Sequence, residues 1–148
     1  MEMMELTDFK HKTRIQIRFK DIDKLGHVNN ANHITYLELA RVNYLNDVFK
    51  QLIDWSKEGI ILARIEVDYK SPIYLEDEVW VYARVSKIGN SSYDMEYVIV
   101  RSVNGNAQIA AFAKSVQVCF NYETNKSMKM PEAWKNYMLN FEDNIQQG

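Results

Sequence analysis

Residues 21–30 bring several chemically active side chains close together in the sequence. They comprise two carboxylates, an imidazole, two carboxamides and a glycine: Asp21, Asp23, His27, Asn29, Asn30 and Gly26. A carboxylate can serve as a nucleophile or as a general base, and an imidazole can orient a substrate or transfer a proton. We therefore expect a functional site on this segment.

The elements on either side of this segment are predicted to position it. Residues 14–19 alternate between apolar and polar side chains, which is typical of a half-buried strand. From residue 30 to about residue 53 the apolar side chains recur at helical spacing and leave a narrow polar stripe, which predicts a buried helix. A loop between a strand and a helix directs its side chains, and the free N–H groups of the first helical turn, towards one place.

Some polar residues of the segment have a structural role in our interpretation. Asn29 and Asn30 are candidates to cap the helix, because their side-chain oxygens can accept hydrogen bonds from first-turn N–H groups. Asp21 is expected to bind N–H groups of the loop or the side chain of Arg18. These residues would hold the site in shape without taking part in its chemistry.

Further polar residues flank the segment. Glu38 lies within an apolar face of the predicted helix, where an unpaired carboxylate is costly, and Arg41 three residues later is its expected partner. His11 and His33 are expected at the surface or in side-chain packing. None of these is predicted to be catalytic.

The remainder of the sequence is predicted to consist mainly of strands. Four segments alternate between apolar and polar residues, namely 61–69, 79–85, 93–103 and 107–120. The pair Asn104-Gly105 between the last two indicates a hairpin turn, and short connections favour an antiparallel meander. We predict an α+β fold in which a curled, five-stranded antiparallel sheet wraps around one long central helix. Residues 131–141 are predicted to form a short amphipathic helix on the outside or against another subunit.

Length and composition limit the class of protein. The chain has 148 residues, of which 47% are hydrophobic, so one domain over residues 1–148 with a sizeable core is expected. The formal net charge is -2 and the basic residues are scattered, so nucleic acid is not an expected partner. No run of about 18 apolar residues occurs, so a membrane span is not predicted and the cytoplasm is the expected location. Cys119 is the only cysteine and is expected to be a small buried or edge residue.

A calcium-binding loop is an alternative interpretation of the polar segment. Asp21, Asp23 and Gly26 fall on the first, third and sixth positions of an EF-hand pattern. However, Leu25 and Asn32 occupy the fifth and twelfth positions, and the twelfth requires a bidentate glutamate. A strand rather than a helix is also predicted before the loop, so no metal site is expected.

The motifs of the chain, taken in order, resemble those of a known family. They are Arg18-Phe19-Lys20-Asp21-Ile22-Asp23, Gly26-His27-Val28-Asn29-Asn30, Tyr36-Leu37-Glu38-Leu39-Ala40-Arg41, Tyr69-Lys70-Ser71-Pro72 and Asp77. With these residues the chain resembles the hotdog-fold acyl thioesterases, in particular the group that includes 4-hydroxybenzoyl-CoA thioesterase and the short bacterial acyl-CoA thioesterases. The resemblance covers nearly the whole chain.

The resemblance implies a hotdog fold and the hydrolysis of acyl-CoA or acyl-ACP thioesters. It implies no cofactor, since coenzyme A is part of the substrate. It assigns Asp23 as the catalytic carboxylate and the backbone N–H at about Asn30 as the donor that polarises the thioester carbonyl. A helix N-terminus supplies such a donor without reorganisation. Whether Asp23 attacks the carbonyl or deprotonates water stays open.

Other residues of the motif are candidates for contacts in the same site. His27 is a candidate for orienting the carboxylate or the substrate carbonyl, because plant acyl-ACP thioesterases share the His-Val-Asn-Asn run. Those enzymes carry an asparagine where this chain has Leu25, so loop packing is the alternative role for His27. Gly26, Val28 and Asn29 are candidate substrate contacts. The resemblance also implies sites at a homodimer interface, and such dimers often pair into homotetramers.

The chain departs from 4-hydroxybenzoyl-CoA thioesterase before the fourth strand. That enzyme carries an arginine pair there for the nucleotide phosphates, whereas this chain has Gly89-Asn90-Ser91-Ser92 with Lys87 nearby. We expect Lys87, Ser91 or Ser92, or a neighbouring subunit, to bind the phosphates, and acyl carrier protein stays open as the thiol carrier. Two rival functions are a non-catalytic acyl-CoA-binding protein and a hotdog dehydratase, which the motif order matches poorly.

Overall fold

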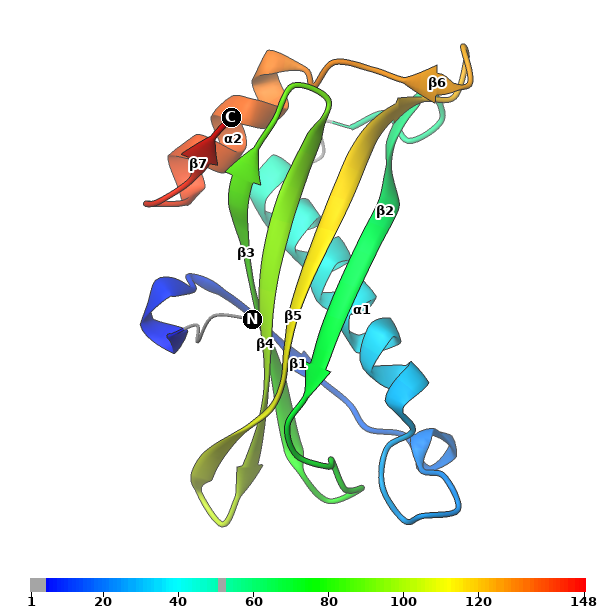
Figure 1. The fold of residues 1–148 in the computed structure, drawn as a ribbon, viewed down its shortest axis with the longest axis vertical. Coiled ribbons are helices and arrows are strands. Elements are labelled where there is room, and N and C mark those ends of the chain that lie inside the picture. Colours follow the sequence, from blue (N-terminus) through cyan, green and yellow to red (C-terminus); the bar gives the residue numbers. More distant parts are fainter. Residues whose placement is uncertain (1–4, 51–52) are drawn as a thin grey trace.

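The fold consists of a long antiparallel sheet with one helix lying along a face of it (Figure 1). A computed structural model describes residues 5–50 and 53–148. The main strands are β1 (His11–Ile15), β2 (Glu58–Tyr69), β3 (Glu78–Ile88), β4 (Ser92–Val103) and β5 (Asn106–Asn121). They pair antiparallel in the order β1-β3-β4-β5-β2. The long helix α1 (Asn30–Phe49) packs on the inner face of the curled sheet, chiefly against β1 and β3.

Several short elements complete the fold. They are the 3₁₀ turns η1 (Leu6–Asp8) and η2 (Phe19–Asp21), the helix α2 (Glu132–Phe141), and the strands β6 (Lys126–Ser127) and β7 (Gln146–Gln147). Strand β6 pairs with β5, and β7 pairs in parallel with β3. The predicted α+β arrangement of five strands curled around one helix is confirmed, and the two short strands extend its sheet.

Period-two alternation in β3 and β4 builds the core beneath α1. The residues of these strands that face the helix are fully buried: Val79, Val81, Ala83, Val85, Tyr93, Met95 and Tyr97. They join the buried side of α1 in one apolar cluster. The predicted alternation is confirmed in β3, where the side chains between the buried ones, such as Trp80 and Tyr82, lie on the outer face and are only partly buried. In β4 it holds only as far as Tyr97, because Val98 and Val100 on the outer face are also buried, in a second apolar cluster.

The turn between β4 and β5 has the predicted geometry. Asn104 and Gly105 both have positive φ angles, 52° and 80°. This backbone matches the twist of a tight hairpin, and asparagine and glycine adopt it at low cost. The hairpin prediction is therefore confirmed.

The first strand is shorter than predicted. It ends at Ile15, and the chain then forms the turn η2, in which Phe19 is 83% exposed. Here the carboxylate of Asp21 accepts the backbone N–H of Arg18 at 3.1 Å, and the N–H of Asp21 donates to the Arg18 carbonyl. These local hydrogen bonds replace strand pairing, so the prediction of a strand to residue 19 was wrong beyond Ile15.

The long helix also ends earlier than predicted. Lys50 follows α1 in a left-handed conformation with φ of 48°, which terminates the helix. Residues 51 and 52, in the predicted extension, lie outside the described residues. Ile53 is not helical.

Strand β2 is one of the two edge strands of the sheet, and β1 is the other. In the described chain it pairs only with β5, and its side chains Ile61 and Leu62 are 39% and 37% exposed. The register also shifts between Leu62 and Arg64, which leaves Ala63 unpaired. The alternation predicted a half-buried strand, and Ile60, Ile65 and Val67 are partly buried against the core, whereas α1 packs chiefly against β1 and β3 and does not cover Ile61 and Leu62.

The C-terminal helix packs against the protein's own long helix. Trp134 of α2 stacks on Phe49 of α1 with ring centroids 5.9 Å apart, and Met138 is fully buried. After α2, the buried carboxylate of Glu142 accepts the hydroxyl of Tyr44 at 2.7 Å and the N–H of Val85 at 2.8 Å. Of the two predicted positions for this tail, the structure places it on the outside of the same chain.

Candidate active site

The polar segment folds into a closed loop between η2 and α1. Ile22 and Val28 form an antiparallel bridge, and the N–H of Asp23 donates to the His27 carbonyl at 3.0 Å. The N–H of Gly26 donates to the Asp23 carbonyl at 3.0 Å, with Gly26 at a φ of +87°. The positive φ explains the glycine, because side chains rarely tolerate this backbone conformation. The loop lies at the lower end of the sheet in Figure 1.

Asp21 holds the base of this loop. Its side chain is 1% exposed and accepts the Tyr36 hydroxyl at 2.7 Å, the Arg18 guanidinium at 3.0 Å and the Arg18 N–H at 3.1 Å. Burial raises the pKa of Asp21, but the hydrogen bonds from Tyr36 and Arg18 outweigh it and bring the pKa below its ordinary value. The predicted structural role of Asp21 is confirmed.

Asp23 is half-buried in the middle of the loop. One carboxylate oxygen accepts the N–H of Leu25 at 2.9 Å, which holds the turn. The other oxygen has no hydrogen-bond donor among the residues that the structure describes. Asp23 therefore combines a fixed side chain with one oxygen that is available to a water molecule or a substrate.

The first turn of α1 leaves one backbone donor unused. The side-chain oxygen of Asn29 accepts the N–H of Ala31 at 2.9 Å, and its carbonyl accepts the N–H of Asn32 at 2.9 Å. Asn29 itself donates its N–H to the Asp21 carbonyl at 2.9 Å. The N–H of Asn30 has no acceptor within the described parts of the chain, so it is free to bind an oxygen that gains negative charge.

The two asparagines therefore have different roles at the start of the helix. Asn29 is the cap, as predicted, whereas Asn30 is the first residue of the helix. A cap at Asn29 satisfies its neighbours and leaves the N–H of Asn30 as the free group.

His27 lies at the surface of the loop without touching the carboxylate. Its Nδ1 is 3.4 Å from the Val28 carbonyl, and its ring meets Tyr74 edge-on with centroids 6.4 Å apart. Within the described residues the structure does not join the imidazole to the side chain of Asp23 by a hydrogen bond. His27 is thus placed near the candidate chemistry but is not oriented against the acid.

The candidate substrate contacts in the loop have different surroundings. Gly26 is exposed and has open space around its Cα. Val28 is 1% exposed within the core, and its N–H donates to the Ile73 carbonyl at 2.8 Å. Asn29 is exposed like Gly26, but its side-chain oxygen is occupied by capping.

The residues expected to bind phosphate lie at the other end of the sheet. Lys87 is close to the end of β3, and Ser91 and Ser92 follow in the turn to β4, at the top of Figure 1. The 11 residues of β3 separate this turn from the loop end by about 35 Å. One chain does not bring Lys87, Ser91 and Ser92 together with Asp23.

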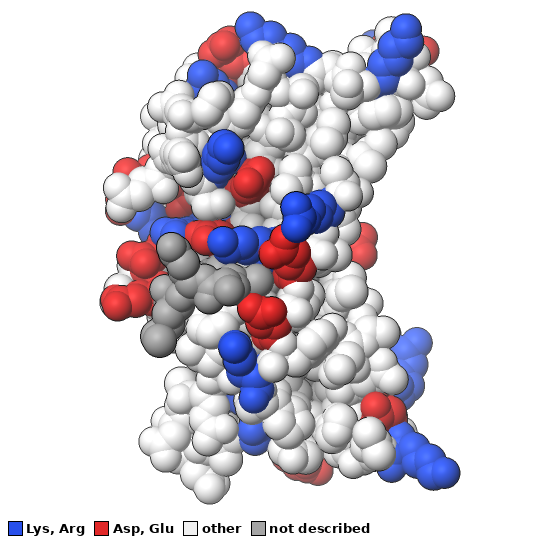
Figure 2. All heavy atoms as spheres, viewed as in Figure 1, with Lys and Arg blue, Asp and Glu red and all other residues white. Residues whose placement is uncertain are grey.

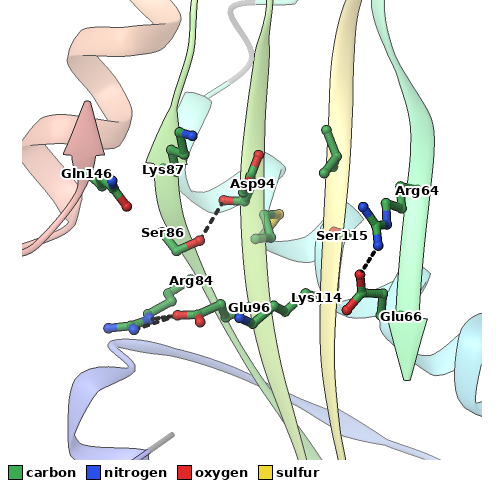
Figure 3. A pocket seen from close by; sticks show the side chains of 12 residues that line it. Arg64, Glu66, Arg84, Ser86, Lys87, Asp94, Glu96, Lys114, Ser115 and Gln146 are labelled. Carbon is green, nitrogen blue, oxygen red and sulfur yellow. Dashed lines mark hydrogen bonds and ion pairs between the residues drawn. The ribbon is translucent and has the colours of Figure 1, made fainter. Parts of the chain in front are cut away.

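Lys87 also lines a groove of about 410 Å³ on the outer face of the sheet (Figure 3). Ion pairs among its lining residues join Arg84 of β3 to Glu96 of β4, and Arg64 to Glu66 along β2. Figure 2 shows basic and acidic side chains interspersed on this face. The groove therefore has no strong charge of one sign.

The expected ion pair between Glu38 and Arg41 is not formed in the described chain. Arg41 is 8% exposed and its guanidinium donates to the Tyr97 hydroxyl at 3.2 Å, beneath the helix. Glu38 is exposed to solvent. The prediction was wrong because spacing along a helix permits the pair, whereas the sheet offers Arg41 a buried partner.

Two tyrosines near the loop were missed in the sequence. Tyr36 binds Asp21, and Tyr69 at the end of β2 donates its hydroxyl to the Asn30 carbonyl at 3.0 Å. Tyr36 lies on the apolar side of α1, six residues after its first residue, so its hydroxyl was the one feature that indicated a polar partner. Tyr69 belongs to a motif that carried the resemblance, but that motif gave it no role, because its partner lies 39 residues away.

Other candidates for chemistry are accounted for by packing. Cys119 is buried as predicted, and burial raises the pKa of its thiol to about 11, unlike a reactive cysteine. His33 and His11 are also buried, and the packing role expected for them is confirmed. Among the described residues there is no group of three acidic, histidine or cysteine side chains arranged to hold a metal ion. In the same residues, every helix is too short or too polar to span a membrane.

Comparison with known proteins identifies the family. The family model described as the thioesterase-like superfamily matches residues 17–138. A crystal structure of a thioesterase from Thermus thermophilus, complexed with coenzyme A and Zn, is 37% identical, with a TM-score of 0.76 over 88% of this chain and 98% of that one. The long-chain acyl-CoA thioesterase FadM of Escherichia coli is 27% identical, over 80% of this chain and 89% of FadM.

A further structure agrees at the level of the fold. It is a 4-hydroxybenzoyl-CoA thioesterase variant complexed with 4-hydroxybenzoyl-CoA, which is 15% identical with a TM-score of 0.77 over 86% of this chain and 96% of that one. The predicted resemblance is confirmed by these matches. The chain therefore belongs to the thioesterase-like superfamily and adopts its hotdog fold.

Proposed function

We propose that this chain hydrolyses acyl-CoA thioesters to a free acid and a thiol. The proposal rests on two neighbouring groups. They are a half-buried carboxylate at Asp23 in the closed loop and an unused backbone N–H at Asn30, the first residue of the helix that follows the loop. Thioester hydrolysis requires a nucleophile or base and a donor for the carbonyl oxygen. Coenzyme A as the thiol carrier is supported by FadM, which is named a long-chain acyl-CoA thioesterase, and by the Thermus thermophilus thioesterase, which is complexed with coenzyme A.

In the proposed mechanism the thioester oxygen binds the N–H of Asn30. The positive end of α1 then stabilises the negative charge that develops on this oxygen. The free oxygen of Asp23 either attacks the carbonyl carbon, giving a mixed anhydride that water hydrolyses, or removes a proton from the attacking water. The thiolate leaves and is protonated in solution, so no cofactor is needed.

His27 has a secondary part in this proposal. Its ring lies at the loop surface beside Tyr74 and makes no hydrogen bond to the Asp23 carboxylate in the described structure. We therefore assign it to the substrate rather than to the orientation of the acid, together with the exposed backbone at Gly26.

The proposal is tested by measuring thiol release from short, medium, long and aromatic acyl-CoAs, and from the same acyl groups on acyl carrier protein. We expect a best acyl-CoA with a kcat of about 1 s⁻¹ or more. Faster turnover on acyl carrier protein would transfer the proposal to that carrier. Stoichiometric binding of acyl-CoA without turnover would support the alternative, a non-catalytic acyl-CoA-binding protein.

We further propose that the chain forms a homodimer through the open edge of β2. This strand is unpaired on one side within the described chain and exposes Ile61 and Leu62. Antiparallel pairing of two such edges would reverse one sheet relative to the other. Lys87, Ser91 and Ser92 of one subunit would then lie at the same end of the assembly as Asp23 of the other, within better reach of a bound coenzyme A.

Lysine at both exposed positions of this edge is expected to break the dimer. In the I61K/L62K variant two unpaired charges enter an apolar contact, so we expect the dissociation constant to rise about 100-fold or more. Analytical ultracentrifugation measures it, with F19K as a control, because Phe19 is exposed in the turn η2 and is not part of the β2 edge. A wild-type chain that sediments as a monomer at micromolar concentration would refute the dimer.

A further inference from the structure

Tyr69 connects the edge strand β2 to the start of α1. It is the last residue of β2, and its hydroxyl donates to the Asn30 carbonyl at 3.0 Å. Its ring meets the ring of His33 edge-on, with centroids 4.9 Å apart. His33 is 2% exposed and Tyr69 is 42% exposed, so a buried ring on the helix supports an accessible ring on the strand.

With this contact, both the N–H and the carbonyl of one peptide group have hydrogen-bond partners outside the helix backbone. The peptide between Asn30 and Ala31 donates its N–H to the side chain of Asn29 at 2.9 Å, and its carbonyl accepts the Tyr69 hydroxyl. The adjacent N–H is that of Asn30, the free donor of the candidate site. Because both ends of the neighbouring peptide are held, the direction of the Asn30 N–H is restricted as well.

The first turn needs such a restraint. Helix ends fray, and α1 packs chiefly on β1 and β3, which leaves its side towards β2 open. Tyr69 reaches across this open side at the site itself. Burial also raises the pKa of the Tyr69 hydroxyl, so the group stays protonated and can donate at neutral pH.

We propose that Tyr69 is a positioning residue, whose hydroxyl holds the first turn of α1 so that the N–H of Asn30 stays directed at the substrate carbonyl oxygen. This inference rests on the proposed function, in which that N–H polarises the thioester. An N–H group that is misdirected loses most of its stabilising effect on the transition-state oxygen, and it weakens substrate binding only a little.

Tyr69→Phe tests the role of the hydroxyl, because it keeps the ring against His33. We expect kcat on the best acyl-CoA to fall about 5- to 30-fold, with KM within about twofold of the wild type. Tyr122→Phe is the matched control, since Tyr122 is similarly exposed, at 45%, and its hydroxyl has no hydrogen-bond partner among the described residues. It should retain wild-type kinetics.

Amide hydrogen exchange supplies a readout that does not depend on turnover. In Tyr69→Phe the N–H groups of Ala31 and Asn32 should exchange faster, while the middle of α1 keeps its protection. Wild-type kcat in Tyr69→Phe, or a loss of activity that follows a general loss of protection, would overturn the inference and leave the proposed function intact. A wild-type protein that hydrolyses no thioester would overturn the proposed function itself, whatever Tyr69→Phe does.

Discussion

Replacing Asp23 with asparagine is expected to lower kcat by about 100- to 10,000-fold on the best acyl-CoA substrate. The carboxamide can neither attack the thioester nor accept a proton from water. Its oxygen can still accept the N–H of Leu25, the 2.9 Å bond that holds the turn, so the loop should keep its shape. Steady-state kinetics gives the loss, and the melting temperature checks that folding is unchanged.

A second aspartate offers a matched control for this substitution. Asp54 accepts the N–H of Ser56 at 3.1 Å, the same two-residue turn that Asp23 makes with Leu25, but it lies outside the candidate site. Asp54→Asn therefore changes an equivalent turn and should leave kcat and KM unaltered. If Asp23→Asn kept more than about a tenth of the wild-type kcat, Asp23 would not be the reacting group.

The same enzyme distinguishes the two mechanisms for Asp23. A single turnover in oxygen-18 water transfers label to the carboxylate if an anhydride with Asp23 forms and water attacks its aspartyl carbonyl. Label confined to the released acid fits general-base catalysis, and it also fits attack of water on the acyl side of an anhydride. Mass spectrometry of the peptide that contains Asp23 therefore gives a positive test for the nucleophilic route.

The fold was predictable where local signals decide the structure. Alternation in β3 and in β4 as far as Tyr97, the Asn104-Gly105 turn and the cap at Asn29 each follow from a few adjacent residues, and the structure confirms them. Alternation also marked β2 as a strand. It could not reveal that Ile61 is exposed, because periodicity identifies two faces without saying what covers them.

The errors arose where a distant partner or a local side chain competes with the expected contact. The guanidinium of Arg41 donates a hydrogen bond to the hydroxyl of Tyr97, 56 residues away, instead of forming an ion pair with Glu38. The strand to residue 19 was replaced by the turn that Asp21 closes. Both outcomes depend on hydrogen bonds, and hydrophobic periodicity contains no information about them.

The position of the candidate site in the chain was predictable, but the hydrogen-bond partners of its residues were not. The order of polar residues predicted a site at the junction of loop and helix, and the structure shows that this segment forms a closed loop. The resemblance already implied the N–H at about Asn30, but the binding of Tyr69 to the same turn depends on long-range packing that the sequence does not contain. The separation of Lys87 from Asp23 likewise follows from strand direction, which sequence order alone does not give.

Replacing Asp21 with asparagine should destabilise the fold by about 2–4 kcal/mol at neutral pH. The buried carboxylate accepts three hydrogen bonds from Arg18 and Tyr36. An amide offers one oxygen and turns an NH₂ group towards the remaining donors, so a buried donor loses its partner. Urea denaturation measures the loss, and a double-mutant cycle with Tyr36→Phe isolates the share of the tyrosine hydroxyl.

The pH dependence of this loss provides a further test of the role of Asp21. Its pKa is lower in the folded protein than in the unfolded chain, because the hydrogen bonds from Tyr36 and Arg18 outweigh burial. The unfolded chain therefore binds the proton more readily, and the stabilisation is present above the ordinary carboxyl pKa of about 4 and disappears as the pH falls through the folded value.

Glu142, whose pKa burial raises, acts in the opposite direction, since its contribution is lost as the pH rises through its folded value. Because Glu142 is common to both proteins, the difference between wild type and Asp21→Asn should shrink as the pH falls below about 4. An equal difference at pH values well above and well below 4 would show that Asp21 stabilises the loop by shape and not by its charge.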